Sequence, residues 1–302
     1  MPKLNNANTD IQSPTVTYSK FSAFLQLTKF RLGSLVVFSA VITYLTVAEH
    51  IDWKQLAALC IGGFLVTSAA NGFNQIIEKD LDKLMDRTKN RPMPTNSLNN
   101  FEALIFCALL GVGGTVLLWT YTNALSGILG FISIVLYALV YTPLKRVTPF
   151  SVLVGAFPGA IPTLIGAVAA TEGFGHINFF AILLFSIQFF WQFPHFWSLA
   201  WFNDEDYKKA SFFMLPSNGG KDEASKFQIL LYTGILLIVS TFPFLFHYVG
   251  LLSVSVVVIS GLAMLLQAYN FYRLSTDQQA KKLFFTTLIY LPVVQLALMT
   301  KI

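Results

Sequence analysis

The chain has 302 residues, of which 55% are hydrophobic and only 12% are charged, and its formal net charge is +5. A soluble domain usually carries about a quarter charged residues, so this composition excludes an ordinary soluble domain and indicates a membrane protein. The positive charge would suit a nucleic acid, but its distribution along the chain follows membrane topology, and we predict no nucleic-acid partner.

Taken in chain order, apolar runs recur nine times, each with about the 20 residues that a helix needs to cross a ~30 Å hydrocarbon core. Only helices satisfy their own backbone polar groups over such lengths in lipid. We therefore predict an all-α integral membrane protein with about nine transmembrane helices, made of a flexible N-terminal tail (1–22) and a single transmembrane domain (23–302). The runs cover roughly 26–48, 55–75, 102–121, 124–142, 149–170, 178–201, 228–248, 250–271 and 284–300.

The Lys and Arg residues fall almost entirely on one side of the predicted membrane. If residues 1–25 lie in the cytoplasm, alternating loops place 18 of the 20 Lys and Arg residues inside and only Lys54 and Lys301 outside. This strong positive-inside pattern supports the count of nine spans, because the loss of one span would scramble the asymmetry. The N-terminus also lacks the apolar stretch of a secretory signal. We expect a bacterial cytoplasmic (inner) membrane, with the N-terminus and the long loops in the cytoplasm.

The first long polar loop, roughly 76–101, carries acids at a regular spacing. Asn74, Glu78, Asp82 and Asp86 lie four residues apart in the stretch NGFNQIIEKDLDKLMDRTKNRPMP. If the second helix continues through residue 86, steps of four residues drift only ~40° each and keep these side chains in one stripe. At a rise of ~6 Å per step, Glu78 and Asp82 can share a divalent ion with Asn74, whereas Asp86 is out of reach unless the helix ends or bends.

The charges of this loop suit a metal ion and a phosphate together. Carboxylates at this spacing repel each other, and their desolvation at the mouth of a membrane helix is costly. A hard cation removes both problems, and Mg²⁺ favours carboxylates, waters and substrate phosphates. Arg87, Lys89 and Arg91 follow at once, and such bases suit phosphate oxygens. The stretch predicts a Mg²⁺–diphosphate site, while a juxtamembrane loop whose bases contact anionic lipid stays open as the alternative.

A second long loop begins where an aromatic span ends. Asp204, Glu205 and Asp206 close that span, and they form either a second part of the site or a solvated loop. His195 lies within the span, after Pro194 and among aromatic residues. A lone intramembrane His is more often a buried hydrogen-bonding residue than a ligand, but aromatic surroundings would also suit a flat macrocycle or a carbocation.

A third inside loop, TPLKRVTP, is short and basic. Its adjacent bases, Lys145 and Arg146, stand at a helix end, where such pairs usually anchor topology. They are also well placed to hold a diphosphate that binds at the first loop.

These motifs resemble the UbiA-type intramembrane prenyltransferases. Asn74, Glu78 and Asp82 match the acidic motif Asn-x-x-x-Asp-x-x-x-Asp of that family's second helix, with Glu in the middle position. Asp206 matches the second acid of the motif on the sixth helix, but Phe202 stands where the first acid would be. The pieces DLDKLMDRTKNRPMP, YTPLKR and QFPHFWSLAW…DYKKASFFMLP are similar to the heme branch of the superfamily, over most of residues 25–300.

The resemblance implies a fold and a reaction. The fold is a helix bundle around an intramembrane cavity, and the enzyme is a Mg²⁺-dependent transferase of prenyl groups. The reaction transfers the farnesyl group of farnesyl diphosphate to the C2 vinyl group of protoheme IX, after which water adds, giving heme O and diphosphate within the biosynthesis of heme A for terminal oxidases. Heme is then a substrate, and heme A synthase and oxidase assembly proteins are candidate partners beside the lipid bilayer.

The resemblance also assigns roles to residues. The catalytic set is Asn74, Glu78, Asp82 and Asp206, of which the first three bind Mg²⁺. The diphosphate-binding set is Arg87, Arg91, Lys145 and Arg146, and His195 positions heme.

Other functions remain open on the sequence alone. The first is the same chemistry on a quinone precursor or another aromatic acceptor. A transporter is disfavoured because every acid–base cluster lies at one face, whereas transporters place functional charges at mid-membrane. A heme-binding assembly scaffold without catalysis would need His195 but neither Glu78 nor Asp82.

Overall fold

The computed structural model describes residues 16–300. Residues 1–15, which make up most of the predicted tail, and residues 301–302, which include Lys301, lie outside the described residues. Within the described part, nine helices are long and apolar enough to cross a membrane, so the predicted all-α membrane protein with about nine spans is confirmed. The elements are α1 (Lys20–Leu27), α2 (Phe30–Val47), α3 (Trp53–Ile77), α4 (Lys79–Asp82), α5 (Asn100–Tyr121), α6 (Ala124–Val135), the π-helical η1 (Leu136–Tyr141), α7 (Thr142–Leu144), α8 (Ser151–Ala169), α9 (Phe179–Phe202), α10 (Asp204–Lys209), α11 (Glu223–Ser240), α12 (Phe242–Leu245), α13 (Leu251–Leu274) and α14 (Asp277–Ala297).

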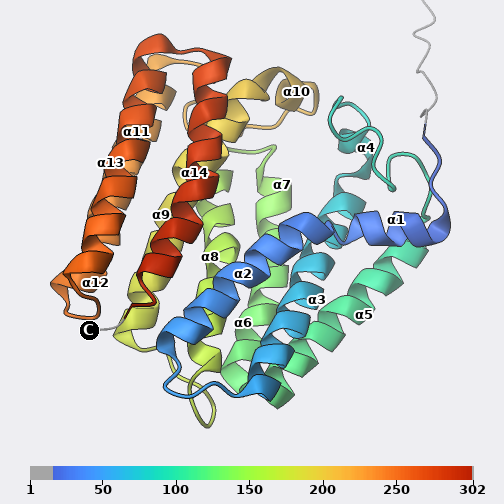
Figure 1. Cartoon of the computed structure of the whole chain (residues 1–302). Helices are drawn as coiled ribbons and strands as arrows, with labels where there is room; N and C mark the ends of the chain where they lie inside the picture. Colours follow the sequence, from blue (N-terminus) through green and yellow to red (C-terminus); the bar gives the residue numbers. More distant parts are fainter. Residues whose placement is uncertain (1–15, 301–302) are drawn as a thin grey trace, which may run out of the picture.

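The spans form one bundle in which most sequence neighbours are also neighbours in space (Figure 1). α3 packs along α5 and against α2, while α6 packs against α5 and α8. α9 contacts α8, α11 and α14, and α13 lies between α11 and α14. α2 packs on α8 and also contacts α14, so the first and the last spans meet.

Two large buried apolar clusters hold most of the spans together, and a smaller third one packs α1 and the first loop against α5. One joins α9, α11, α13 and α14 around side chains such as Phe193 and Phe271, and the other joins α2, α3, α6 and α8 around side chains such as Tyr44 and Leu59. Large apolar side chains on the outside of the bundle stay exposed, Leu109 among them. Such an apolar outer surface is expected of helices that contact lipid.

Glycines set the closest approach between spans. A Cβ atom added at Gly166 of α8 would lie 2.1 Å from the carbonyl oxygen of Ala40 on α2. One added at Gly114 of α5 would lie 2.8 Å from the carbonyl oxygen of Gly62 on α3. Only glycine permits these contacts, because any side chain would force the two backbones apart.

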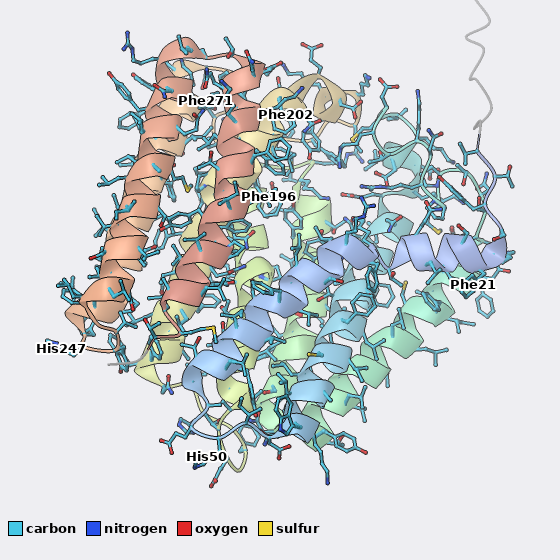
Figure 2. The ribbon with its side chains drawn as sticks, in the orientation of Figure 1. Phe21, His50, Phe196, Phe202, His247 and Phe271 are labelled. Carbon is cyan, nitrogen blue, oxygen red and sulfur yellow. The ribbon has the colours of Figure 1, made fainter. Side chains whose placement is uncertain are left out.

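Both long polar loops lie at the same end of the bundle. The segments that contain α4 and α10 meet there, whereas His50 and His247 mark short loops at the opposite end (Figures 1 and 2). The bundle therefore gathers its two acid-rich segments on one membrane face.

The helix that carries the acids ends earlier than the sequence predicts. We expected the second span to continue through residue 86, and this is wrong: α3 ends at Ile77, and Glu78 leaves helical geometry with φ −91° and ψ 6°. α4 then adds only four residues. After α4 the chain turns back, and Thr88 Oγ1 donates to the carbonyl oxygen of Asp82 at 2.9 Å across this turn. Asp86 therefore lies on the returning loop.

Candidate active site

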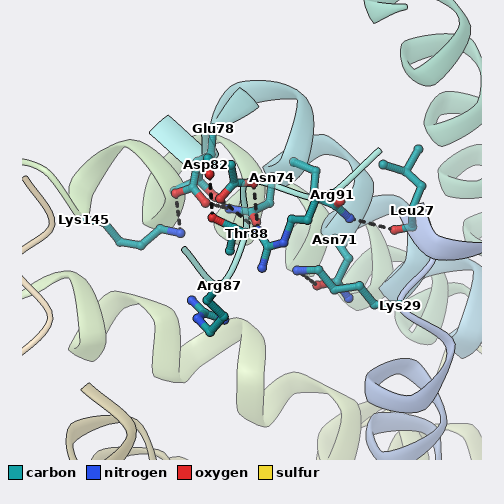
Figure 3. Close-up of polar contacts among 12 residues, drawn as sticks. Leu27, Lys29, Asn71, Asn74, Glu78, Asp82, Arg87, Thr88, Arg91 and Lys145 are labelled. Carbon is teal, nitrogen blue, oxygen red and sulfur yellow. Dashed lines mark hydrogen bonds and ion pairs between the residues drawn. The ribbon is translucent and has the colours of Figure 1, made fainter. Parts of the chain in front are cut away.

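Three polar side chains predicted as metal ligands lie together at the end of α3 (Figure 3). Asn74, Glu78 and Asp82 have exposed fractions of 3%, 3% and 0%, so each needs a partner inside the protein. The amide nitrogen of Asn74 donates to Glu78 Oε2 at 2.9 Å and to Thr142 Oγ1 at 3.0 Å. Because these bonds use the nitrogen, the amide oxygen of Asn74 is the atom left to approach a cation.

Thr142 reaches the cluster because the fourth span ends irregularly. The π-helical segment η1 precedes it, and Thr142 Oγ1 donates to the carbonyl oxygen of Tyr137 at 2.8 Å. Single π-helical turns inside α-helices occur often at functional sites. The bond to Tyr137 within η1 orients the Thr142 hydroxyl, which in turn accepts the hydrogen bond from Asn74. The fourth span (Ala124–Leu144) is thereby joined to α3 at the cluster.

Each carboxylate is paired with a base, Asp82 with one from the same loop and Glu78 with one from the end of the fourth span. Arg91 Nη1 donates to both oxygens of Asp82, at 3.0 and 2.8 Å. Lys145, which is itself buried, forms an ion pair with Glu78 Oε1. Burial lowers the pKa of the Lys145 ammonium below its ordinary value, while the Glu78 carboxylate opposes that shift. The structure thus brings two predicted metal ligands and two predicted diphosphate ligands into one neutral cluster.

Aromatic rings face the ammonium of Lys145. Its Nζ lies 4.9 Å from the ring centroid of Tyr141 and 5.2 Å from that of Phe212. Ring faces attract cationic charge, and they do so more strongly away from water. These two rings therefore form an apolar, cation-tolerant wall beside the acids.

Sequence reasoning missed two further polar side chains near this cluster (Figure 3). Lys29 Nζ donates to Asn71 Oδ1 at 3.3 Å, and Lys29 itself has a left-handed φ of 51° at the junction of α1 and α2. A lysine at the start of an apolar run looks like a topology charge, so only the fold places it here. Asn71 stands three residues before Asn74, outside the four-residue series.

Arg87 is a further base beside the cluster. It donates from Nη2 to the hydroxyl of Tyr207 at 3.4 Å, and its guanidinium lies 5.5 Å from the centroid of that ring. Burial raises the pKa of the Tyr207 hydroxyl, so this group stays protonated at neutral pH. Tyr207, on α10, is a site residue that its sequence pattern does not mark.

Asp206 holds the first loop in place and does not share the ligand cluster in this structure. Its Oδ1 accepts from the backbone N–H of Asp86 at 2.8 Å, and its Oδ2 accepts from that of Arg87 at 3.2 Å. Burial raises the pKa of Asp206, but these bonds and one from Lys209 outweigh it, so its pKa lies below the ordinary value. Hydrogen bonds from Lys209 and Lys89 lower the pKa of the exposed Asp86 carboxyl to about 2. Asp206 therefore positions the backbone of Arg87.

The remaining residues singled out from the sequence make no hydrogen bond or ion pair with Asn74, Glu78 or Asp82 among residues 16–300. Arg146 is exposed, unlike its neighbour Lys145. Asp204 is buried and pairs with Lys208 at 2.6 Å, and Glu205 is exposed. His195 lies inside α9, where its Nδ1 is 2.8 Å from Thr287 Oγ1 on α14.

The donor set at the cluster fits Mg²⁺ shared with a substrate. Among residues 16–300, no three or more His, Cys, Asp or Glu side chains are grouped to hold a metal ion. The predicted set has two carboxylates and one amide, and Mg²⁺ often takes one or two carboxylates and completes its shell with waters and phosphate oxygens. The set therefore fits a magnesium ion bound together with a diphosphate, and it does not form a protein-only cage.

The fold and this cluster define a class of protein: a multi-pass helical membrane protein with buried acids and bases at one end of its bundle. The sequence pattern described as the UbiA prenyltransferase family matches residues 35–289. The chain therefore belongs to the UbiA prenyltransferase family, as its motifs predict.

Named relatives and solved structures agree with this membership. The chain is 47% identical to the protoheme IX farnesyltransferase of Flavobacterium johnsoniae over 286 residues, and this aligned region covers 92% of this chain and 93% of that protein. It resembles the solved structure of digeranylgeranylglyceryl phosphate synthase with a TM-score of 0.77 at 20% identity, over 93% of this chain and 97% of that one. A UbiA homologue from Archaeoglobus fulgidus bound to GPP and Mg²⁺ gives a TM-score of 0.65 at 14% identity, over 91% of this chain and 99% of that one. At such identities, the structures show the fold.

Proposed function

We propose that this chain transfers the farnesyl group of farnesyl diphosphate to the C2 vinyl group of protoheme IX, and that water adds to the carbon cation that this leaves, giving heme O with its hydroxyethylfarnesyl side chain, and diphosphate. The observation that carries the proposal is the 47% identity to a protoheme IX farnesyltransferase over nearly the full length of both chains. Three further relatives of the same name are 42–45% identical over at least 92% of this chain. The paired acids and bases support it, because they supply ligands for both a cation and a diphosphate.

The bases of the cluster would bind and orient the diphosphate. Arg91 and Lys145 are held at the site by Asp82 and Glu78, and Arg87 stands beside them. On substrate binding, Arg91 and Lys145 would transfer their hydrogen bonds from the carboxylates to phosphate oxygens, which are strong acceptors for both. Since each base leaves a carboxylate free as it moves, the metal ligands become available in the same step.

Asn74, Glu78 and Asp82 would then hold Mg²⁺, with the GPP and Mg²⁺ of the Archaeoglobus fulgidus homologue as support by analogy of fold. Bound Mg²⁺ supplies Lewis-acid stabilisation of the charge that develops on the departing diphosphate. After this exchange of partners, Arg91, Lys145 and Arg87 would stabilise the same charge by hydrogen bonds to the phosphate oxygens. Tyr141 and Phe212 would exclude water from the allylic carbon and tolerate its positive charge.

The other predicted residues take outer roles. Asp206 would keep Arg87 at the diphosphate through the backbone of the first loop. Arg146 stays a prediction for diphosphate binding, since its exposed side chain would have to turn inward. His195 is proposed to position heme from α9.

The membrane context follows from the charge distribution. With 18 of 20 Lys and Arg residues on one side of the predicted membrane, the site would open to the cytoplasmic face of a bacterial inner membrane. The two long loops at one end of the bundle support that orientation (Figure 1). We propose that residues 23–302 act as one catalytic domain.

The test is a membrane assay with farnesyl diphosphate, Mg²⁺ and one acceptor at a time, read by mass spectrometry. Protoheme IX should give a hydroxyethylfarnesyl heme, while quinone precursors should give no prenylated product. A prenylated quinone precursor without modified heme would overturn the heme assignment and favour the alternative acceptor class. Product from neither acceptor would contradict prenyl transfer to these compounds altogether.

A further inference from the structure

The ring of His195 is held by three aromatic rings and one hydrogen bond. Trp191 stacks on it with ring centroids 4.3 Å apart and planes at 19°, and Phe284 stacks at 4.8 Å and 27°. Phe196 meets it edge-on at 5.3 Å. With a hydrogen bond at Nδ1 as well, the ring has one orientation, and Nε2 is the ring nitrogen that makes no hydrogen bond with residues 16–300.

The partner of Nδ1 decides where the proton of the neutral imidazole lies. Thr287 Oγ1 donates its own proton to the carbonyl oxygen of Phe284 at 2.6 Å. The hydroxyl can therefore only accept from His195, across the 2.8 Å contact between Oγ1 and Nδ1. The proton then sits on Nδ1 and leaves a lone pair on Nε2. No hydrogen bond engages Nε2 within residues 16–300, so that lone pair is free for a ligand.

Thr287 is itself fixed from α9. Trp191 Nε1 donates to the carbonyl oxygen of Thr287 at 2.8 Å. Trp191 lies four residues before His195 on α9, so this bond fixes the backbone of Thr287 relative to the helix that carries His195. Thr287 has an exposed fraction of 0%. Trp191, Thr287 and His195 thus contact one another across α9 and α14, and these contacts fix the position of the His195 ring.

We propose that Thr287 is a positioning residue, which fixes His195 in the Nδ1-protonated form so that Nε2 can bind the iron of an iron porphyrin substrate. The proposal rests on the proposed function, since it takes the acceptor to be heme. Neutral imidazole nitrogens are common ligands of heme iron, and the hydrogen bond at the other ring nitrogen usually sets which nitrogen is free.

The test uses detergent-purified full-length protein titrated with ferric protoheme and followed by optical absorption. Thr287→Val removes the hydroxyl while it keeps the shape, and Thr287→Ser keeps the hydroxyl. Thr286→Val is the matched control, because Thr286 also donates to a carbonyl of its own helix but lies on the exposed side. His195→Gly, with and without added imidazole, identifies the iron ligand.

We expect wild type, Thr287→Ser and Thr286→Val to share one histidine-ligated heme spectrum and one affinity. Thr287→Val should bind heme about 10- to 100-fold more weakly, which is the usual cost of losing the partner of a metal-bound histidine. His195→Gly should lose the spectrum and recover it with imidazole. Each variant is first checked for its unfolding temperature, so that loss of fold is not read as loss of ligation.

Two results would overturn the proposal. One is a Thr287→Val protein that is folded and matches wild type in spectrum and affinity. The other is a His195→Gly protein with an unchanged spectrum, which would place the iron ligand elsewhere. Product formation is measured on the same preparations: modified heme from wild type together with either result would reject the positioning role and leave the proposed function standing. Absence of modified heme would reject the function itself.

Discussion

The two polar regions of this molecule are built in opposite ways. Just after the end of α3, Glu78 and Asp82 pair with Lys145 and Arg91, so two ion pairs lie close together. Inside the bundle, the ring of His195 is held by a neutral hydrogen bond and two aromatic faces. Charged pairs can exchange partners with a charged ligand, whereas a stacked and hydrogen-bonded ring keeps one orientation. The first region suits capture and release of a ligand, and the second suits holding one geometry.

Asp82→Ala should have the largest effect, because it removes the carboxylate of the Arg91–Asp82 ion pair. We expect product formation to fall by more than about 10²-fold, since Asp82 is a proposed metal ligand at the developing charge. Membranes with equal amounts of inserted protein are compared by mass spectrometry of heme. Asp80→Ala is the matched control, because the Asp80 side chain is 85% exposed and pairs with Lys83. Wild-type product from Asp82→Ala would remove the cluster from the mechanism.

Lys145→Met should act on both binding and stability. It removes a proposed diphosphate ligand, which should raise KM for farnesyl diphosphate about 10- to 100-fold for one charged hydrogen-bond donor. It also leaves the buried Glu78 carboxylate without its partner, which typically costs about 3–5 kcal/mol of stability.

The double variant Lys145→Met with Glu78→Gln separates the two effects. It should regain much of the unfolding temperature, because no buried charge is left unpaired, but it should not regain activity. Arg146→Met provides the exposed comparison and should change KM less than Lys145→Met. An equal rise in KM for farnesyl diphosphate in Lys145→Met and Arg146→Met would mean that the buried position of Lys145 beside Glu78 gives it no special role in diphosphate binding.

Exchange of partners predicts that Mg²⁺ and diphosphate bind cooperatively. Mg²⁺ alone must displace Lys145 and Arg91 from the acids, and pyrophosphate alone must draw them away and leave the acids unpaired. Each should therefore strengthen the binding of the other by about 5- to 150-fold, the usual range of such coupling. Calorimetric titration of purified protein with each alone and with both measures this factor. Equal affinities in the presence and absence of the other would argue against exchange.

The smallest expected effect concerns the contact between the two long loops. Asp206 and Asp86 both have pKa values below the ordinary range, so their contribution to stability is fully present above about pH 4. It is lost as the pH falls through the lowered values. The unfolding temperature of Asp206→Asn should therefore lie below that of wild type by a constant amount between about pH 5 and 8, and the two should converge at lower pH. If the gap in unfolding temperature between wild type and Asp206→Asn widened as the pH fell, the lowered carboxyl pKa values would not explain it.

Much of the fold could be predicted because lipid imposes simple rules. Hydrocarbon thickness and backbone hydrogen bonding fixed the nine spans, and the placement of Lys and Arg located the polar end. Asn74, Glu78 and Asp82 were found because their four-residue spacing is a local signal. The turn after α4 could not be found in this way, since Asp82 is held there by Arg91 and Thr88, which come later in the loop.

Other parts of the site depend on distance in sequence. Thr287 lies 92 residues from His195, and nothing in either local sequence links them. Lys29 and Tyr207 likewise join the cluster only once α1 and α10 are placed. Asp206 was predicted at the right end of the molecule, but its contacts with backbone N–H groups of the first loop could not be read from a motif.

The most direct test of the exchange at α3 is an experimental structure with Mg²⁺ and a non-hydrolysable analogue of farnesyl diphosphate. The account predicts that Lys145 and Arg91 contact phosphate oxygens, and that Glu78 and Asp82 contact the metal ion. An intact Lys145–Glu78 pair and an intact Arg91–Asp82 pair, with the diphosphate bound elsewhere, would contradict it.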